Sequence, residues 1–350
     1  MTSKGIFINM THFTWKMRLT RHFSTFLSGT KQVPLLIGGQ AVMEGVMMKS
    51  RHHLATAVRK QGGKISLRHR RERSFAERTG ISKIPFVRGM VILFETMIIG
   101  FRELNWSANE ALGEEEEKLT GWEIFLTLTF SIILALALFK LLPLFLATLI
   151  TKKAAGGNWM LNLLDGGIKF LIFIGYIITI GQFKDVKRLF QYHGAEHKSV
   201  NCYEDGKKLT PHNAKRFTKK QARCGTTFVV YVFVLSIFLY LFIPFGSGFW
   251  MKYLLRIALL PLIAGIVYEW VRVAGKYYKK SGLVRIISAP GMAVQALTTR
   301  EPDFRQLEVA IAALQQVIRE EQNETKKGGE SRQREKTTAK NAQKKTLTKK

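Results

Sequence analysis

The chain has 350 residues and a formal net charge of +29, from 54 Lys and Arg against 25 Asp and Glu. Its mean hydropathy is +0.02, although 47% of the residues are hydrophobic and 23% are charged, because the two kinds are segregated along the chain. This composition indicates membrane spans between solvated segments and excludes an acidic protein that attracts cationic partners. Anionic lipid headgroups and RNA are the natural electrostatic partners of so basic a chain.

Residues 1–32 form a basic N-terminal segment without the continuous apolar core of a secretory signal. Residues 33–118 follow as a cytoplasmic unit of strands and an amphipathic helix, whose strand-rich part ends at about residue 75 and contains a glycine turn at residues 61–63 that is typical of a β-hairpin. From residue 85 to about residue 112, apolar residues recur every three or four positions. This spacing predicts a helix packed on the membrane bundle or lying at its interface.

Four apolar runs are long enough to cross a bilayer, which takes about 20 residues. Two fall within residues 119–183 and two within residues 226–274, and they cover about residues 122–150, 167–183, 226–245 and 253–273. The charged residues expected inside them are Lys140, Lys169 and Glu269, too few for an evident ion pathway. Transport is therefore the weakest functional alternative.

The loops predict the orientation of the spans, because basic residues concentrate in cytoplasmic connections. Segment 184–225 holds eleven Lys or Arg, whereas the two short links hold only Lys152 with Lys153, and Lys252. We therefore expect both termini and the 184–225 loop to face the cytoplasm of a cell-membrane protein. Residues 275–321 would then be a cytoplasmic segment with an amphipathic helix over 299–321. The Lys-rich tail, residues 322–350, is predicted to be disordered.

The sharpest local pattern is His193-Gly194-Ala195-Glu196-His197. On a helix this spacing places both imidazoles on one face, one turn apart, where they suit a zinc ion. The same order of residues occurs in the inverted zinc peptidases. His193 and His197 are therefore candidate metal ligands, and Glu196 is the candidate catalytic residue that activates a water.

A zinc site of this kind needs a third ligand, and Glu269 is the first choice. It lies near the cytoplasmic end of the fourth span. An ionisable group within a span destabilises the protein unless it faces a partner or an aqueous cavity. An ion pair with Arg272 is the alternative. Cys202 and Cys224, the only two cysteines, could instead close a structural Cys2His2 site with both histidines, or be small buried residues.

Segment 38–48 places closely spaced glycines around a lone carboxylate, Glu44. A glycine-rich backbone can approach a ligand closely, and Glu44 is a second candidate catalytic residue, as a base or a ligand. A buried turn with methionine packing explains the segment equally well. The basic residues of segment 51–73 need only anionic lipid as a partner, and a protein or RNA partner at this basic face is the alternative.

Several of these segments together resemble the YqhQ-like bacterial multi-pass membrane proteins, a family of unknown function. The resemblance covers about residues 35–320. It is carried by Gly-Gly-Gln-Ala-Val-Met-Glu-Gly-Val-Met-Met (38–48), Tyr-His-Gly-Ala-Glu-His-Lys (192–198), Asn-Cys-Tyr-Glu (201–204), Arg-Cys-Gly-Thr (223–226), Ala-Pro-Gly (289–291) and Leu-Thr-Thr-Arg-Glu-Pro (297–302). It implies a bacterial inner-membrane protein, sometimes labelled a metal-dependent enzyme. The chain departs from the family at Gln221-Ala222, where His-Pro is common.

The sequence thus predicts an α-helical membrane protein with about four transmembrane helices and a small cytoplasmic α+β part that contains a β-hairpin. Its expected function is a metal-dependent hydrolase whose cytoplasm-facing site binds zinc or another divalent metal. The rival hypothesis is a non-catalytic membrane scaffold or regulator whose basic cytoplasmic face binds an anionic partner.

Overall fold

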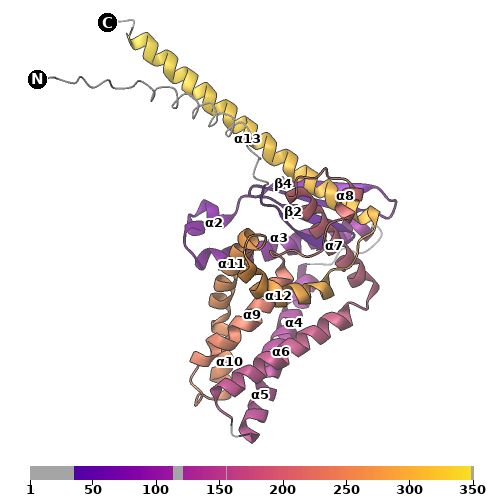
Figure 1. Cartoon of the computed structure of the whole chain (residues 1–350), viewed down its shortest axis with the longest axis vertical. Coiled ribbons are helices and arrows are strands. Elements are labelled where there is room, and N and C mark those ends of the chain that lie inside the picture. The colour runs from indigo at the N-terminus through magenta and orange to yellow at the C-terminus, as the bar shows by residue number, and fades with distance from the viewer. Residues whose placement is uncertain (1–34, 113–120, 155, 348–350) are drawn as a thin grey trace, which may run out of the picture. The chain divides into compact units, whose positions relative to one another are not determined.

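The structure is a computed structural model that describes residues 35–112, 121–154 and 156–347. The basic N-terminal segment, residues 1–32, lies outside the described residues. The helices and strands all belong to one unit, Leu36–Lys350. Within it, Figure 1 shows the long apolar helices grouped together and a small sheet covered by other helices.

The sheet is antiparallel, with its four strands in the order β1, β2, β3 and β4. The strands are β1 (Gly38–Val42), β2 (Gly45–Lys49), β3 (His53–Arg59) and β4 (Ile65–Arg71). The predicted hairpin is confirmed as β3 and β4, whose register pairs Arg59 with Ile65 across the glycine turn. Gly63 has a φ of +80° in that turn, which glycine adopts without steric cost.

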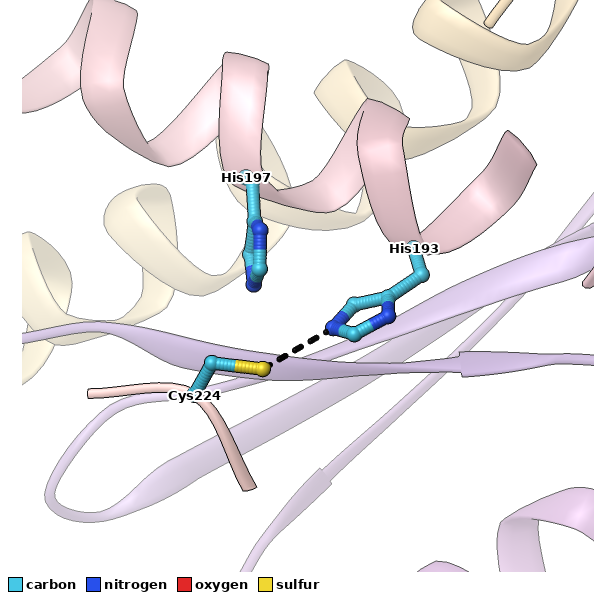
Figure 2. Close-up of side chains that lie close together, drawn as sticks. All are labelled: His193, His197 and Cys224. Atoms are coloured by element: carbon cyan, nitrogen blue, oxygen red, sulfur yellow. Dashed lines mark hydrogen bonds between the residues drawn. The ribbon is translucent and has the colours of Figure 1, made fainter. Parts of the chain in front are cut away.

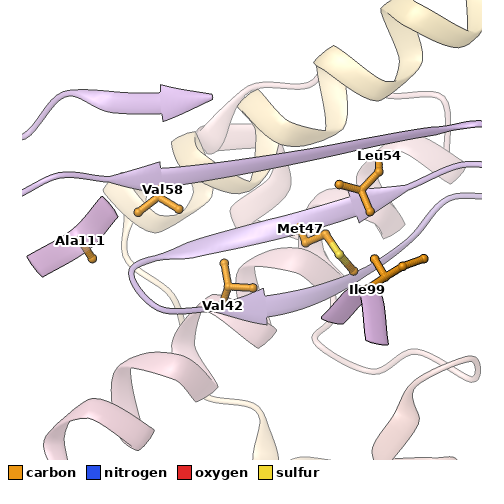
Figure 3. Close-up of a cluster of buried hydrophobic side chains, with 6 residues drawn as sticks. All are labelled: Val42, Met47, Leu54, Val58, Ile99 and Ala111. Atoms are coloured by element: carbon orange, nitrogen blue, oxygen red, sulfur yellow. The ribbon is translucent and has the colours of Figure 1, made fainter. Parts of the chain in front are cut away.

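Both faces of the sheet are covered, which explains the almost complete burial of β3. Leu54 and Val58 point to one face, against α3 (Val87–Leu112), as Figure 3 shows. The alternate residues of a strand point to the opposite face, where β2 and β3 contact α13 (Phe304–Leu347). Helix α3 confirms the helix predicted over residues 85–112. Two short helical turns precede it, α2 (Phe75–Arg78) and η1 (Ile81–Lys83).

Four segments are long and apolar enough to cross a membrane, in agreement with the predicted number: Phe125–Lys153, Asn158–Ile180, Gly225–Phe242 and Phe249–Tyr277. They are built from α4 (Gly121–Leu136), η2 (Ala137–Leu141) and α5 (Leu142–Lys153); α6 (Asn158–Ile180); α9 (Gly225–Leu239) and η3 (Tyr240–Phe242); and α10 (Phe249–Ala258) with α11 (Leu260–Tyr277). The second span begins well before the predicted residue 167, because the polar residues Asn162 and Asp165 are buried against neighbouring helices.

Segment 184–225, which was expected to be a loop, is largely helical. It contains α7 (Lys184–Glu204) and α8 (Pro211–Lys215). After the last span, α12 (Gly282–Thr298) packs on α9. The structure also differs from the predicted disorder of the tail, since α13 continues to Leu347. That stretch is rich in Lys, Glu and Gln and has no proline, a composition that favours a helix.

The spans enclose buried charges that the sequence reasoning did not identify. Asp165 of α6 accepts a hydrogen bond of 2.9 Å from Lys169 Nζ and lies 2.8 Å from Nη1 of Arg256 on α10. All three residues are at most 3% exposed. The sequence analysis expected only Lys140, Lys169 and Glu269 as charged residues inside the spans. Asp165 and Arg256 must be added to them. An unpaired ion costs several kcal/mol in such an interior, so this carboxylate holds α6 and α10 together.

Replacing Asp165 with alanine should destabilise the protein by about 3–5 kcal/mol, because Lys169 and Arg256 would stay buried without their carboxylate. Unfolding of the purified protein in detergent by heat or urea measures the loss. Asp185→Ala is the matched control, because Asp185 is exposed and surface substitutions change stability by about 0.5 kcal/mol or less. Equal stabilities of the two variants would show that the buried network contributes nothing.

Candidate metal centre

Helix α7 carries both predicted histidines and Glu196, and it is held on several sides. It contacts β1, α8 and α13. Its tightest approach is at Gly194, where a Cβ atom would lie 2.1 Å from the carbonyl oxygen of Arg300. Glycine weakens a helix, but here its missing side chain lets the backbone that follows α12 pass directly beside His193.

The two imidazoles meet Cys224, the residue just before α9. His193 Nε2 lies 3.2 Å from Cys224 Sγ, and one donor atom from each of His193, His197 and Cys224 lies within 4.8 Å of the others. Figure 2 shows both rings extending from α7 toward the sulfur. We call these three residues the His-Cys cluster. His197 and Cys224 are buried and His193 is partly exposed, so His193 is the most accessible member of the cluster.

The outer nitrogen of each ring is bound by the backbone. His193 Nδ1 lies 2.9 Å from the carbonyl oxygen of Thr298, and His197 Nδ1 is hydrogen-bonded to the carbonyl oxygen of Lys219. A carbonyl oxygen only accepts, so each Nδ1 donates its proton. In the neutral rings, both Nε2 atoms then present lone pairs toward the cluster. Proteins orient metal-binding histidines by this kind of hydrogen bond.

Electrostatics within the cluster favour the thiolate. Burial alone raises the pKa of Cys224, but the hydrogen bonds from His193 and His197 outweigh it and bring that pKa well below its ordinary value. Burial alone lowers the pKa of His193, and the hydrogen bond and charge of Cys224 outweigh it to raise that pKa to about 9. The thiolate is the form of cysteine that binds metals and attacks substrates.

Glu196 lies beside the cluster in an almost solvent-free position. It is 2% exposed, and its Oε2 lies 3.3 Å from His197 Nε2. Burial raises the pKa of Glu196, against the opposing effect of the two imidazoles. Beneath it lies Gly39 of β1, where a Cβ atom would come within 2.7 Å of Glu196 Cγ. The glycine-rich segment 38–48 therefore approaches the site through its backbone.

The carboxylate of that segment points elsewhere. Glu44 lies in the turn between β1 and β2 with a φ of +47°. Both of its carboxylate oxygens accept hydrogen bonds from Arg188, and the Tyr192 hydroxyl donates to it at 3.3 Å. Arg188 and Tyr192 belong to α7, so Glu44 ties the sheet to the helix that carries the histidines. The structure thus gives it a positioning contact and does not include it in the His-Cys cluster.

Glu269, the first choice for a third metal ligand, is also placed outside the cluster. It accepts two hydrogen bonds of 2.6 Å from Arg88 of α3. Its alternative partner, Arg272, is 3.9 Å away. Two hydrogen bonds from the Arg88 guanidinium to the Glu269 carboxylate form a stronger contact than a single exposed ion pair would. The third donor beside the histidines is Cys224 instead.

Cys202 does not share the site either. It is buried, and its Sγ contacts the carbonyl oxygen of Lys208 at 3.8 Å, so the closed Cys2His2 arrangement does not form. Gln221, which precedes the Arg223-Cys224 pair, is bound to Gln295 of α12. Its N–H donates to the Gln295 side chain and its carbonyl oxygen accepts from it, both at 2.9 Å. This pair holds the segment before Cys224 against α12.

Thr298 and Lys219 are the site residues that sequence reasoning missed. Both act through backbone carbonyls, which every residue has, so their side chains gave no chemical signal. The conspicuous segment 297–302 was the available clue. Its Arg300 N–H donates a hydrogen bond of 2.9 Å to the carbonyl oxygen of Phe190 on α7, which keeps the Thr298 carbonyl beside His193.

Comparison with known proteins places the chain in a family. Residues 84–320 match the model of a family described as a protein of unknown function (DUF1385). The chain belongs to this family. It is similar to the uncharacterized protein YqhQ of Bacillus subtilis (strain 168), with 34% identity over 301 residues that cover 82% of this chain and 94% of that protein. No solved structure matches the chain. The resemblance predicted from the motifs is confirmed, and family membership brings no reaction with it.

Gly194→Ala should destabilise the protein by about 1–3 kcal/mol, the usual cost of forcing extra volume into a packed site. The added methyl group would meet the Arg300 carbonyl oxygen, and α7 or the 298–300 segment must move. Thermal unfolding in detergent measures the effect. Gly167→Ala in α6 is the control, because a Cβ atom there meets nothing within 4 Å. Two indistinguishable unfolding curves would contradict the tight packing of α7.

Proposed function

We propose that this DUF1385 protein is a membrane-bound metal-dependent hydrolase with a zinc-type site at the His-Cys cluster. The supporting observation is that one donor atom from each histidine and the sulfur converge within 4.8 Å while backbone carbonyls bind both Nδ1 atoms. Imidazole nitrogen and thiolate sulfur are donors that zinc prefers. Three protein ligands leave a fourth coordination position free, which is the mark of a catalytic zinc site.

The roles of the surrounding residues follow from their positions. Zinc at such a site supplies a water of lowered pKa and polarises an oxygen of the substrate. Glu196 stands 3.3 Å from His197 Nε2, within reach of a water at the ligand atoms, and it would take a proton from that water and return it to the leaving group. Substrate would reach the cluster from the side of His193, its partly exposed member.

The membrane determines the proposed substrate class. Cys224 immediately precedes the span Gly225–Phe242, so the His-Cys cluster belongs at the surface of the bilayer. A substrate that is itself associated with the membrane would meet the cluster there. The eleven Lys or Arg of segment 184–225 favour the cytoplasmic surface, since basic connections stay inside. We therefore propose a cytoplasm-facing site and cytoplasmic termini.

Metal analysis of the purified protein tests the ligands. His193→Ala, His197→Ala and Cys224→Ser should each reduce bound zinc from about one ion per chain to a small fraction of that, because two remaining donors hold zinc weakly. Cys202→Ser is the matched control, since it makes the same chemical change at a buried thiol outside the cluster. Elemental analysis by mass spectrometry measures the zinc, and full retention in the histidine variants would refute the proposal.

Glu196→Gln tests the catalytic role separately. The variant should keep its zinc while hydrolysis of chromogenic ester and phosphodiester probes in mixed micelles falls by roughly 10²–10⁴-fold, the contribution of a general base. Zinc content is measured on the same samples. An unchanged rate would remove Glu196 from the mechanism, and an unchanged phenotype in cells would favour the rival scaffold, which needs no chemistry from this site.

A second candidate function rests on the thiol itself. Cys224 stands at the N-terminus of α9 with Sγ 3.2 Å from His193 Nε2, and a histidine and a helix N-terminus both stabilise a thiolate nucleophile. Hydrolysis would then proceed through attack by this sulfur. Retained activity in zinc-depleted protein, abolished by alkylation of Cys224, would favour this candidate over the metal centre.

A further inference from the structure

A basic pocket lies outside the His-Cys cluster, where α11 approaches the sheet. Its volume is about 560 Å³, which is within the range of small-molecule binding sites. It is lined by the end of β2, by α2 with its flanking residues, by α3 and by α11. Figure 1 shows α2 and α3 beside α11. No residue of the His-Cys cluster lines it.

The carboxylates of the lining already have partners. Two of the three pair with arginines and the third accepts a hydrogen bond from a hydroxyl, and all three are outnumbered by the seven Lys and Arg of the lining. The pairs are Glu72 with Arg70 at 3.0 Å, Glu77 with Arg51 at 2.9 Å and Glu95 with the Ser74 hydroxyl at 2.6 Å.

Three cations of the lining remain without a carboxylate. Lys49, Arg78 and Arg102 all border the pocket, and none forms a salt bridge within the described residues. Burial lowers the pKa of Lys49, although nearby carboxylates oppose the effect. A bound anion would stabilise its charged form. The pocket therefore presents excess positive charge that an anionic ligand would neutralise.

An apolar stripe on α3 runs beside this pocket. Phe94, Met97, Ile98 and Phe101 are each at least 40% exposed, and their spacing puts them on one face of the helix. The opposite face, with the buried Ile99, packs on the sheet. A helix with an apolar face of this kind lies in the surface of a bilayer, so the stripe places the pocket at the membrane.

The length of the fourth span agrees with that placement. It covers 29 residues, Phe249–Tyr277, whereas about 20 suffice to cross the hydrocarbon core. Its last turns therefore extend into the headgroup layer. Tyr268 and Arg272, which line the pocket, belong to those turns.

We propose that this pocket binds the phosphate-bearing headgroup of an anionic phospholipid. Arginine matches phosphate in charge and geometry, and Arg78 and Arg102 supply two unpaired guanidinium groups. The exposed stripe on α3 would bury the adjoining acyl chains, which a soluble phosphate lacks. The site is independent of the His-Cys cluster and of the hydrolase proposal.

Native mass spectrometry of the full chain in detergent tests this site, with phosphatidylglycerol and phosphatidylcholine as probes. The protein should retain phosphatidylglycerol in preference. The Arg78→Gln/Arg102→Gln variant should bind it roughly 25-fold more weakly, because each basic residue near anionic lipid contributes about 1 kcal/mol, or roughly fivefold. Both residues are exposed, so the fold should persist, as thermal unfolding and zinc content would verify.

Lys280→Gln/Arg285→Gln is the matched control, because it removes the same charge at exposed positions that do not line the pocket. Unaltered lipid binding in this control, with loss in the pocket variant, supports the site. An equal loss of phosphatidylglycerol binding in both variants would show that only the overall charge matters, and it would overturn the proposal. Displacement of phosphatidylglycerol by an equal concentration of inorganic phosphate would also overturn it, in favour of a soluble anion.

Discussion

The candidate metal centre depends on how closely backbone can approach α7. Gly194 admits the carbonyl oxygen of Arg300, and Gly39 of β1 leaves space for the side chain of Glu196. A side chain at either position would separate α7 from its neighbour. With both glycines in place, the Thr298 carbonyl reaches His193 and Glu196 is enclosed beside His197. The orientation of the imidazoles is thus a consequence of packing, fixed before any ligand binds.

A second close junction connects the sheet with the membrane helices. Glu269 of α11 holds Arg88 of α3 by two hydrogen bonds, and a Cβ atom at Gly265 would lie 2.7 Å from the Phe86 carbonyl oxygen. Phe86 itself has a φ of +64°, which is costly for a bulky residue. The contact with Gly265 and the Arg88 pair offset that cost. The acid expected to bind metal therefore joins the two parts of the fold.

The sequence predicted the features that depend on the spacing of residues along the chain. It did not predict which of several similar residues tertiary packing brings into the site. Long apolar runs predicted the four spans, and the His193 and His197 spacing predicted two of the three residues of the cluster. Glu269 was the first choice for the third ligand and Cys224 takes that place, because nothing local in the sequence says which of the two packs beside α7. Carbonyl groups carry no signature in a sequence. Asp165 was missed because it lies just before residue 167, where the second span was predicted to begin. The sequence alone did not show that its carboxylate is buried beside Arg256 of α10.

The His-Cys cluster also couples the site to the assembly of the membrane bundle. Its two nitrogens come from α7, its sulfur from the start of α9, and the carbonyl that orients His193 from the end of α12. These segments are distant in sequence and meet only when α12 has packed on α9 and Gln295 has bound Gln221. A metal bound at the cluster would add its binding energy to that packed state alone. Because the cluster and its orienting carbonyl come from α7, the start of α9 and the end of α12, the site forms only in the completed fold.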